Sequence, residues 1–318
     1  MPKILVRHSH IIINDYEMGD SERLERNFSI WDPLRHESNI KVLEYIEDKK
    51  QLIVPRGVDI PYLNGLFETN AKVDYEHDPY DYVGPIQLKY RPRDNVQKEA
   101  LAFMQGERGY RKNKGLSQLS INLNTGAGKT YCCIANSAIS GIRSIVITSS
   151  IDWLNQWKDA ILEYTDTMPR EIYMLIGSAS IYRLLDRDIS QYKFIMASHD
   201  TIRSYGDRNG WDKVTELFKY MKVGFKYYDE AHLNFDNMAK IDAYTNTYKS
   251  FYVTATPKRS DEKEDIIYSY YFKNVPAIDL FDDEDDPRTH YIAIRYNSRP
   301  KPQDISNCRN PYGFDKNS

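Results

Sequence analysis

The chain has 318 residues, 41% of them hydrophobic, and a formal net charge of −3 at pH 7. This length is sufficient for two compact domains with sizeable cores. Three cysteines without a CxxC pair argue against a disulfide or zinc framework, and no apolar run is long enough to cross a membrane. We therefore expect a cytoplasmic protein with no membrane partner. The acidic balance argues only weakly against a nucleic-acid partner, because phosphates are bound along a local groove.

Residues 1–84 are predicted to form a small α+β accessory domain. Residues 3–13 are rich in β-branched side chains and predict one strand, and residues 51–57 predict another. Residues 38–50 place Ile40, Leu43 and Ile46 at helical spacing and predict a short amphipathic helix. Residues 74–85 are polar, with two prolines and a glycine, which is typical of a linker.

Residues 85–275 predict an α/β domain in which short apolar strands alternate with helices. Strands are expected at 119–123, 144–148, 172–176, 193–198, 224–229 and 250–255. Such alternation favours a mostly parallel sheet with helices on both faces. In residues 276–318 we expect a solvated acidic loop at 279–286, one strand at 290–296 and a linker-like tail.

A glycine-rich segment, Leu123–Thr130, joins the strand at 119–123 to a helical run. Backbone N–H groups between a strand and a helix N-terminus bind anions, and glycines let the backbone curl around a phosphate. Lys129 would reach the β- and γ-phosphates of ATP, and the Thr130 hydroxyl would bind Mg²⁺. The predicted nucleotide-binding residues of this loop are Thr125, Gly126, Ala127, Gly128, Lys129 and Thr130.

The strand at 224–229 ends in two carboxylates, Asp229 and Glu230, followed by His232. A carboxylate at the carboxyl end of a parallel strand can hold Mg²⁺, and its neighbour can orient and deprotonate the attacking water. We assign Asp229 to the metal and Glu230, with Lys129, to catalysis. Acidic residues also finish strands and cap helices, so this motif gains its meaning from the phosphate loop about one hundred residues earlier.

The order of these motifs resembles superfamily 2 helicases and translocases, most closely DNA helicases of the UvsW-type phage group and their XPB-like relatives. In that family the first RecA-like motor domain carries a phosphate loop, a DEAH or DExx box and a Thr-Ala-Thr motif, here Thr254–Thr256. The resemblance implies that Thr254, Thr256 and His232 couple the nucleotide to the nucleic-acid track. It also implies that Gln97 reads the adenine edge, although Arg93 stands four residues before this glutamine and the family usually has three.

Two softer matches imply contacts with the nucleic-acid backbone. By analogy, Thr148, Ser149, Ser198 and Thr201 would meet the sugar-phosphate chain. Such contacts position a strand without reading its sequence. Helix capping explains each of these residues equally well. Trp153 and Trp157 lie four apart on one helix and are expected in the core.

Residues 260–318 contain no QxxGRxxR-like arginine motif and are too few for a second RecA-like domain. We expect that domain to follow in the same chain or to come from another subunit, with truncation favoured. The function expected from the sequence is the ATP-binding half of a DNA helicase or branch-remodelling translocase acting on single-stranded or branched DNA, with ATP and Mg²⁺ as cofactors. Alternatives are a duplex translocase such as a restriction motor, an RNA helicase, and a nucleotide-switched binding module. The sequence leaves open whether residues 1–84 bind DNA.

Overall fold

The computed structural model describes residues 2–32, 37–41, 44–46, 50–67, 71–73, 77–233, 235–255, 271–280, 309–310 and 313–314. The chain divides into two compact units, residues 1–281 and 282–318. In the second unit the described residues form a short antiparallel pair, β15 (Arg309–Asn310) and β16 (Gly313–Phe314). No helix in the described ranges is long and apolar enough to span a bilayer.

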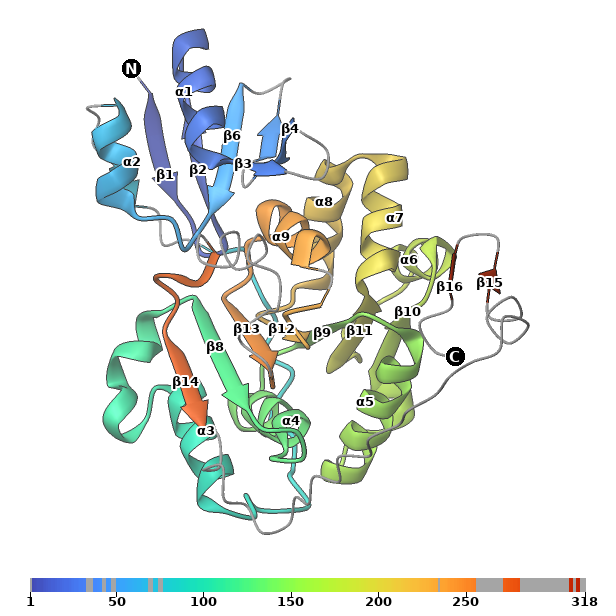
Figure 1. Ribbon diagram of the computed structural model, residues 1–318. Helices are drawn as coiled ribbons and strands as arrows, with labels where there is room; N and C mark the ends of the chain where they lie inside the picture. Colours follow the sequence, from blue (N-terminus) through green and yellow to red (C-terminus); the bar gives the residue numbers. More distant parts are fainter. Residues whose placement is uncertain are drawn as a thin grey trace, which may run out of the picture. The chain divides into compact units, whose positions relative to one another are not determined.

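The larger sheet of the first unit contains seven described strands in the order β10-β11-β9-β12-β13-β8-β14, and every neighbouring pair is parallel (Figure 1). The strands are β8 (Gln118–Leu123), β9 (Ser144–Thr148), β10 (Ile172–Leu175), β11 (Phe194–Ser198), β12 (Phe225–Asp229), β13 (Lys249–Thr254) and β14 (Ala277–Leu280). The first six are the six strands predicted from hydrophobic patterning. Because the strands are parallel, their carboxyl ends meet at one edge of the sheet.

Helices cover both faces of this sheet, as expected for buried parallel strands. One core cluster contains residues of α3 (Asn95–Gln105), α4 (Lys129–Ser140) and α5 (Ile151–Tyr164). The other contains residues of α6 (Ser178–Leu185), α7 (His199–Asn209), α8 (Trp211–Met221) and α9 (Phe235–Tyr244). Along β12, Tyr227 belongs to the first core and Tyr228 to the second, which is the alternation of a strand buried on both sides.

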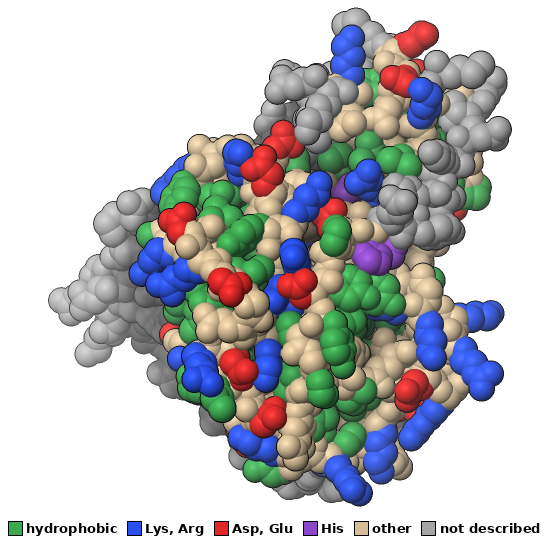
Figure 2. Space-filling model, turned by 180° about the vertical axis from the view of Figure 1, so that it is seen from behind, with side chains coloured by type: hydrophobic (Ala, Val, Ile, Leu, Met, Phe, Trp, Pro, Cys, Tyr) green, Lys and Arg blue, Asp and Glu red, His purple; other side chains and the backbone are tan. Residues whose placement is uncertain are grey.

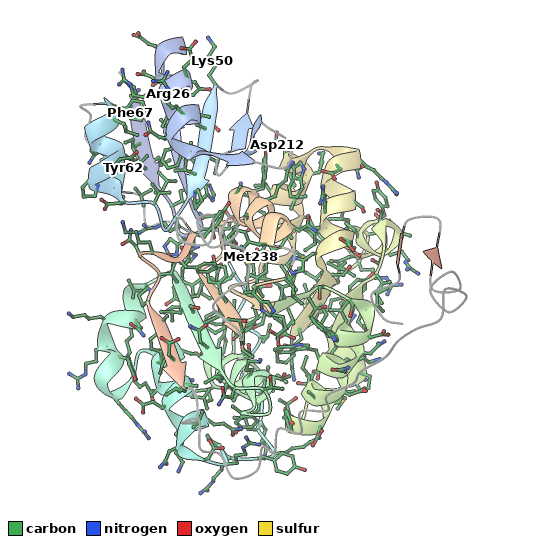
Figure 3. The ribbon with its side chains drawn as sticks, viewed as in Figure 1. Arg26, Lys50, Tyr62, Phe67, Asp212 and Met238 are labelled. Carbon is green, nitrogen blue, oxygen red and sulfur yellow. The ribbon has the colours of Figure 1, made fainter. Side chains whose placement is uncertain are left out.

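The N-terminal part contains a five-stranded sheet in the order β5-β6-β2-β1-β7 and a separate pair, β3 with β4. The elements are β1 (Lys3–Val6), β2 (His10–Asn14), α1 (Met18–Phe28), β3 (Ser29–Asp32), β4 (Glu37–Lys41), β5 (Glu44–Ile46), β6 (Gln51–Pro55), α2 (Ile60–Phe67) and β7 (Ala71–Val73). Buried residues of β1, β2 and β6 share one core cluster with α6–α9. Figure 3 shows Met238 of α9, which is fully buried, in the region between this sheet and the larger one.

Three sequence-based expectations differ from the structure. Residues 3–13 form two antiparallel strands instead of one, since the chain turns between Val6 and His10. The described residues of the segment 38–50 are not helical: residues 38–41 belong to β4, which pairs with β3, and residues 44–46 form β5, which pairs with β6. Strand pairing and a β-branched composition outweigh the helical spacing there. The acidic run begins inside β14, where Asp279 accepts a hydrogen bond from the Asn122 amide at 2.7 Å, and its remainder and the strand expected at 290–296 lie outside the described residues.

Residues 77–85 are the described part of the segment predicted as a linker. They run past the amino ends of the large sheet's strands and form hydrogen bonds there. Backbone N–H groups of Asp78, Asp81 and Val83 donate to carbonyls of residues 246, 222 and 141. The Asp81 carboxylate accepts a hydrogen bond from Arg143, whose side chain is only 1% exposed. The same guanidinium also donates to the carbonyls of Ile189, Tyr192 and Met221. Arg143 therefore joins the connecting segment, α8 and the loop before β11.

Replacing Arg143 with Met is expected to lower the free energy of unfolding by about 3 to 5 kcal/mol, because three carbonyls and the Asp81 carboxylate lose their donor. Chemical denaturation with a stability readout checks this. Lys213→Met is the matched control, because Lys213 is exposed and, among the described residues, forms an ion pair with Glu216 of the same helix alone. Equal stability of the two variants would contradict the structural role given to Arg143.

Candidate nucleotide and nucleic-acid site

The phosphate loop connects the last residue of β8, Leu123, to the first residue of α4, Lys129. Gly126 and Gly128 have φ angles of 81° and 92°, a region that favours glycine. Thr125 and Gly126 are exposed and residues 127–130 are half-buried, so the loop is open to a ligand. The loop ends where the backbone N–H groups of the first turn of α4 have no intrahelical acceptor, which suits a phosphate.

Gln97 and Arg93 brace this loop from α3. The Gln97 amide nitrogen donates to the carbonyl of Ala127 at 3.2 Å, and its oxygen accepts the N–H of Arg93 at 2.9 Å. The Arg93 guanidinium donates to the carbonyl of Gly126 at 2.7 Å. Asp94 caps α3 by accepting the backbone N–H of Gln97. The start of α3 and the phosphate loop thus form one hydrogen-bonded assembly.

Asp229 lies at the carboxyl end of β12, where Trp157 of α5 orients it. The indole N–H donates to Asp229 Oδ2 at 2.6 Å, and the backbone N–H of Glu230 donates to Oδ1 at 3.1 Å. Burial raises the pKa of Asp229, the neighbouring Glu230 charge raises it further, and the Trp157 hydrogen bond and Lys129 oppose that rise. Trp157 is buried, as predicted, but it also fixes the position of the carboxylate.

A chain of polar contacts links the phosphate loop to β13. Lys129 Nζ lies 3.1 Å from Glu230 Oε1, and Glu230 Oε2 lies 3.3 Å from His232 Nδ1. His232 Nδ1 is also 2.8 Å from Thr254 Oγ1. Glu230 adopts a left-handed backbone with φ of 48°, an uncommon conformation for a residue with a side chain. The structure thus brings Lys129, Glu230, His232 and Thr254 together, whereas Thr256 lies outside the described residues.

The residues predicted to hold Mg²⁺ fit a hard cation. Thr130 offers a hydroxyl that no other described residue engages, and Asp229 offers a carboxylate. Oxygen donors of this kind are the ligands that Mg²⁺ prefers. The burial that raises the pKa of Asp229 also means that a nearby cation would stabilise its ionised form. A bound Mg²⁺ would supply charge neutralisation for phosphate oxygens.

A hollow of about 670 Å³ lies where β9, β10 and β11 end and α5, α6 and α7 begin. Ser149, Ser198 and Thr201 line it, while Thr148 is fully buried and donates to the carbonyl of Ser150. Ser198 caps α7 by accepting the N–H of Thr201, and Ser150 caps α5. Ser198 is therefore a helix cap, and Thr201 supplies the N–H that it accepts. Three helix N-termini border the hollow, but its charged lining consists of two carboxylates, Asp152 and Asp200, and one cation, Arg208.

Sequence reasoning missed two contributors to the site. The Trp157–Asp229 hydrogen bond joins residues 72 positions apart, which no local pattern shows. The spacing of Arg93 from Gln97 differs from that of the family, so the sequence did not assign it a role. In the structure its guanidinium donates to the phosphate loop directly. The proline at 92 and the cap at Asp94 were the available signals, because they place Arg93 just before α3.

Replacing Gly128 with Ala is expected to weaken ATP binding and stability more than replacing Gly126 with Ala. Both positions have positive φ, so both variants carry a similar backbone strain. Only at Gly128 would the new Cβ meet a side chain, lying 2.2 Å from the Gln97 amide nitrogen. The extra cost is about 1 to 3 kcal/mol. Calorimetric ATP binding and thermal unfolding of the two variants check this, and equal effects would contradict the brace described for Gln97.

Trp157→Phe should raise the Mg²⁺ concentration required for nucleotide binding about tenfold, because a hydrogen bond to a charged group is worth about 1.5 to 3 kcal/mol. The measurement is ATP affinity across a Mg²⁺ titration. Trp153→Phe is the control, since this half-buried side chain makes no hydrogen bond with the described residues. If the two variants need the same Mg²⁺, Trp157 does not position Asp229.

Comparisons with known proteins identify the family of this chain. Residues 89–259 match the family model described as type III restriction enzyme, res subunit. A curated relative, the putative DNA 3'-5' helicase Rad25 of Haloarcula marismortui, is 27% identical over 148 residues, which are 45% of this chain and 21% of that protein. The chain therefore spans only about a fifth of this relative.

Two solved structures share the fold. The structure of the UvsW helicase from bacteriophage T4 superposes with a TM-score of 0.56 at 16% identity, covering 88% of this chain and 99% of that one. A second T4 UvsW structure gives 0.53 at 16% identity and covers 88% and 56% of the two chains. At this identity the likeness establishes the fold alone. Because the family model covers more than half of the chain, the protein belongs to the type III restriction enzyme res subunit family and carries the RecA-like ATPase domain of superfamily 2 helicases.

Proposed function

We propose that the chain is the ATP-binding half of an ATP-dependent DNA helicase or branch-remodelling translocase. The observation that carries this proposal is the contact chain from Lys129 through Glu230 and His232 to Thr254. These contacts connect Lys129, which would bind phosphate, to the Thr-Ala-Thr motif at Thr254. In this superfamily that motif couples ATP to the bound nucleic acid. A site that only binds nucleotide has no need for such a connection.

In this proposal each group has one role. Lys129 and the amides of residues 125–130 hold the phosphates. The resemblance assigns Gln97 to the adenine edge, and this role requires Gln97 to exchange its hydrogen bonds with Arg93 and Ala127 for the base. Glu230 orients and deprotonates the attacking water, while Thr130 and Asp229 hold Mg²⁺. Phosphate oxygens compete with Glu230 for Lys129, so nucleotide binding would release the carboxylate for catalysis. His232, Thr254 and Thr256 pass that change toward the track.

The nucleic-acid track would follow the hollow at α5, α6 and α7. Ser149, Ser198 and Thr201 line it, and Arg208 adds a cation. DNA is favoured over RNA because the curated relative is described as a putative DNA 3'-5' helicase. We assign residues 1–84 to an accessory domain, 85–275 to the motor domain and 276–318 to the connection to a second RecA-like domain, in cis or in trans. That domain would supply the transition-state arginine, which raises related phosphoryl transfers about 10³- to 10⁵-fold.

A duplex translocase that never separates strands is the second candidate, favoured by the restriction-enzyme description of the family model. It would use the same ATP site. Strand displacement on a forked DNA, set beside triplex displacement on an intact duplex, separates the two functions. Competition between DNA and RNA for the protein tests the choice of track.

With a second motor domain present, Lys129→Ala should lose both ATP binding and DNA-stimulated hydrolysis. Glu230→Gln should lose hydrolysis by about 10² or more but bind ATP as well as or better than the wild type, because it removes the carboxylate that competes for Lys129. Radiolabelled ATP turnover and equilibrium nucleotide binding give the two readouts.

Lys158→Ala serves as the control, because this half-buried lysine lies on α5 and forms no ion pair with the described residues. Turnover that is independent of nucleic acid, or an active Lys129→Ala, would refute the proposed motor function. Weaker ATP binding by Glu230→Gln would refute the competition for Lys129 but leave the function standing.

A further inference from the structure

A cationic surface outside the site lies on the 3₁₀ segment η2 (Arg108–Gly115), between α3 and β8. Four of its eight residues, Arg108, Arg111, Lys112 and Lys114, are cations, and all four are exposed. We name these four residues the η2 patch. Figure 2 shows Lys and Arg side chains gathered at the lower right edge of that view, the side on which α3 and η2 lie.

The patch is held on a fixed support. The Tyr110 hydroxyl donates to Glu99 of α3 at 2.7 Å, and its ring packs edge-on against Phe103. Asn113 is buried; its amide donates to the carbonyl of Phe103, and its own carbonyl accepts a hydrogen bond from Lys249 of β13. The inward-facing anchors therefore alternate with the outward-facing cations.

The backbone at Gly106, where α3 ends, lies close to the backbone of Lys114 in η2. Gly106 ends α3 with φ of 66°, and a Cβ there would lie 2.7 Å from the backbone nitrogen of Lys114. The two ends of the segment are thus in contact, which keeps the four cations on one small surface.

The charges of the patch are not neutralised within the described part of the chain. None of the four cations forms an ion pair or side-chain hydrogen bond with a described residue. Residues 107–115 contain one carboxylate, Glu107, so the segment carries a net charge of +3 in a chain whose net charge is −3. Clustered like charges raise the free energy of the folded protein unless an anion offsets them.

We propose that the η2 patch binds the phosphate backbone of a second segment of DNA, apart from the strand in the hollow. This inference rests on the proposed function. The patch precedes β8 and so lies at the amino end of that strand, whereas the hollow lies at the carboxyl ends of β9, β10 and β11. A DNA molecule bound along the hollow would therefore contact the η2 patch through a different segment, such as an arm of a branched duplex.

The chemistry of the surface favours a phosphodiester chain over an acidic protein. No large hydrophobic side chain of residues 107–116 is exposed, and Ile139 of α4, which lines a hollow beside Glu107 and Lys114, is a single exposed apolar side chain there. Stable protein interfaces usually have a buried apolar or aromatic centre, whereas non-specific DNA binding rests on Lys and Arg alone. The four cations also offer no base-reading geometry, so the binding would not depend on DNA sequence.

The test is the salt dependence of DNA binding by the 318-residue chain, measured by fluorescence anisotropy with a branched duplex and with a short single strand. The variant is Arg111→Gln with Lys112→Gln and Lys114→Gln. The control replaces three exposed cations elsewhere, Arg170, Arg187 and Lys219, with Gln. Each phosphate contact on B-DNA contributes about 0.9 to the log–log slope, so the patch variant should lose about 2 to 3 for the branched duplex. Binding of the short strand, binding of ATP and thermal stability should match the control.

The outcomes are separable. If the wild type binds neither DNA at low salt, both the track proposed for the hollow and this inference are overturned, whereas the ATPase role is tested separately by Lys129→Ala. If the wild type binds both but the patch variant keeps the slope of the control, only the η2 inference is overturned, and an acidic protein becomes the better partner for the patch. An equal loss for the short strand and the branched duplex overturns the assignment to a second DNA segment.

Discussion

The hydrogen bonds of β13, with β12 on one side and β8 on the other, hold the site together. In this register Val253 is opposite Asp229, and Thr254 is opposite Asn122, one residue before the phosphate loop begins at Leu123. The end of β8 thus meets the ends of β12 and β13, which come more than a hundred residues later in the chain, at one edge of the sheet. A shift of one residue in either pairing would turn Thr254 to the opposite face and break its contact with His232. The polar chain from Lys129 to Thr254 is therefore a consequence of strand register.

A second polar cluster fastens β12 and β13 on the face that α9 covers. Lys226 of β12 is fully buried and pairs with Asp242 of α9, which also accepts hydrogen bonds from Tyr228 and Tyr252. Burial lowers the pKa of Lys226, while Asp242 opposes that change. An unpaired charge there would be costly, so α9 is bound to the sheet at a fixed position. Because α9 follows the carboxylate pair and packs against β6, it joins the ATP site to the N-terminal sheet.

The motor fold was largely predictable because its signals are local. Six apolar strands, the glycines at 126 and 128 and the carboxylates at 229 and 230 can each be read within a few residues. Tertiary pairing was not predictable in the same way. The segment 38–50 has helical spacing, but its described residues 38–41 and 44–46 pair as strands. The acidic run begins in β14, where Asp279 accepts a hydrogen bond from the Asn122 amide. Trp157 was placed correctly in the core, but its hydrogen bond to Asp229 depends on how α5 crosses the sheet.

In this structure the Lys129 ammonium is paired with the Glu230 carboxylate at 3.1 Å. The two partners are only 11% and 23% exposed, so their attraction is weakly screened. One Glu230 oxygen lies beside Lys129 and the other lies 3.3 Å from Nδ1 of His232. A displacement of the Glu230 carboxylate from Lys129 would therefore also change its distance to His232. Phosphate oxygens carry more charge than one carboxylate and are the stronger partner for Lys129. Under the proposed function, occupation of the loop would free Glu230 and so change its contact with His232, which also contacts Thr254.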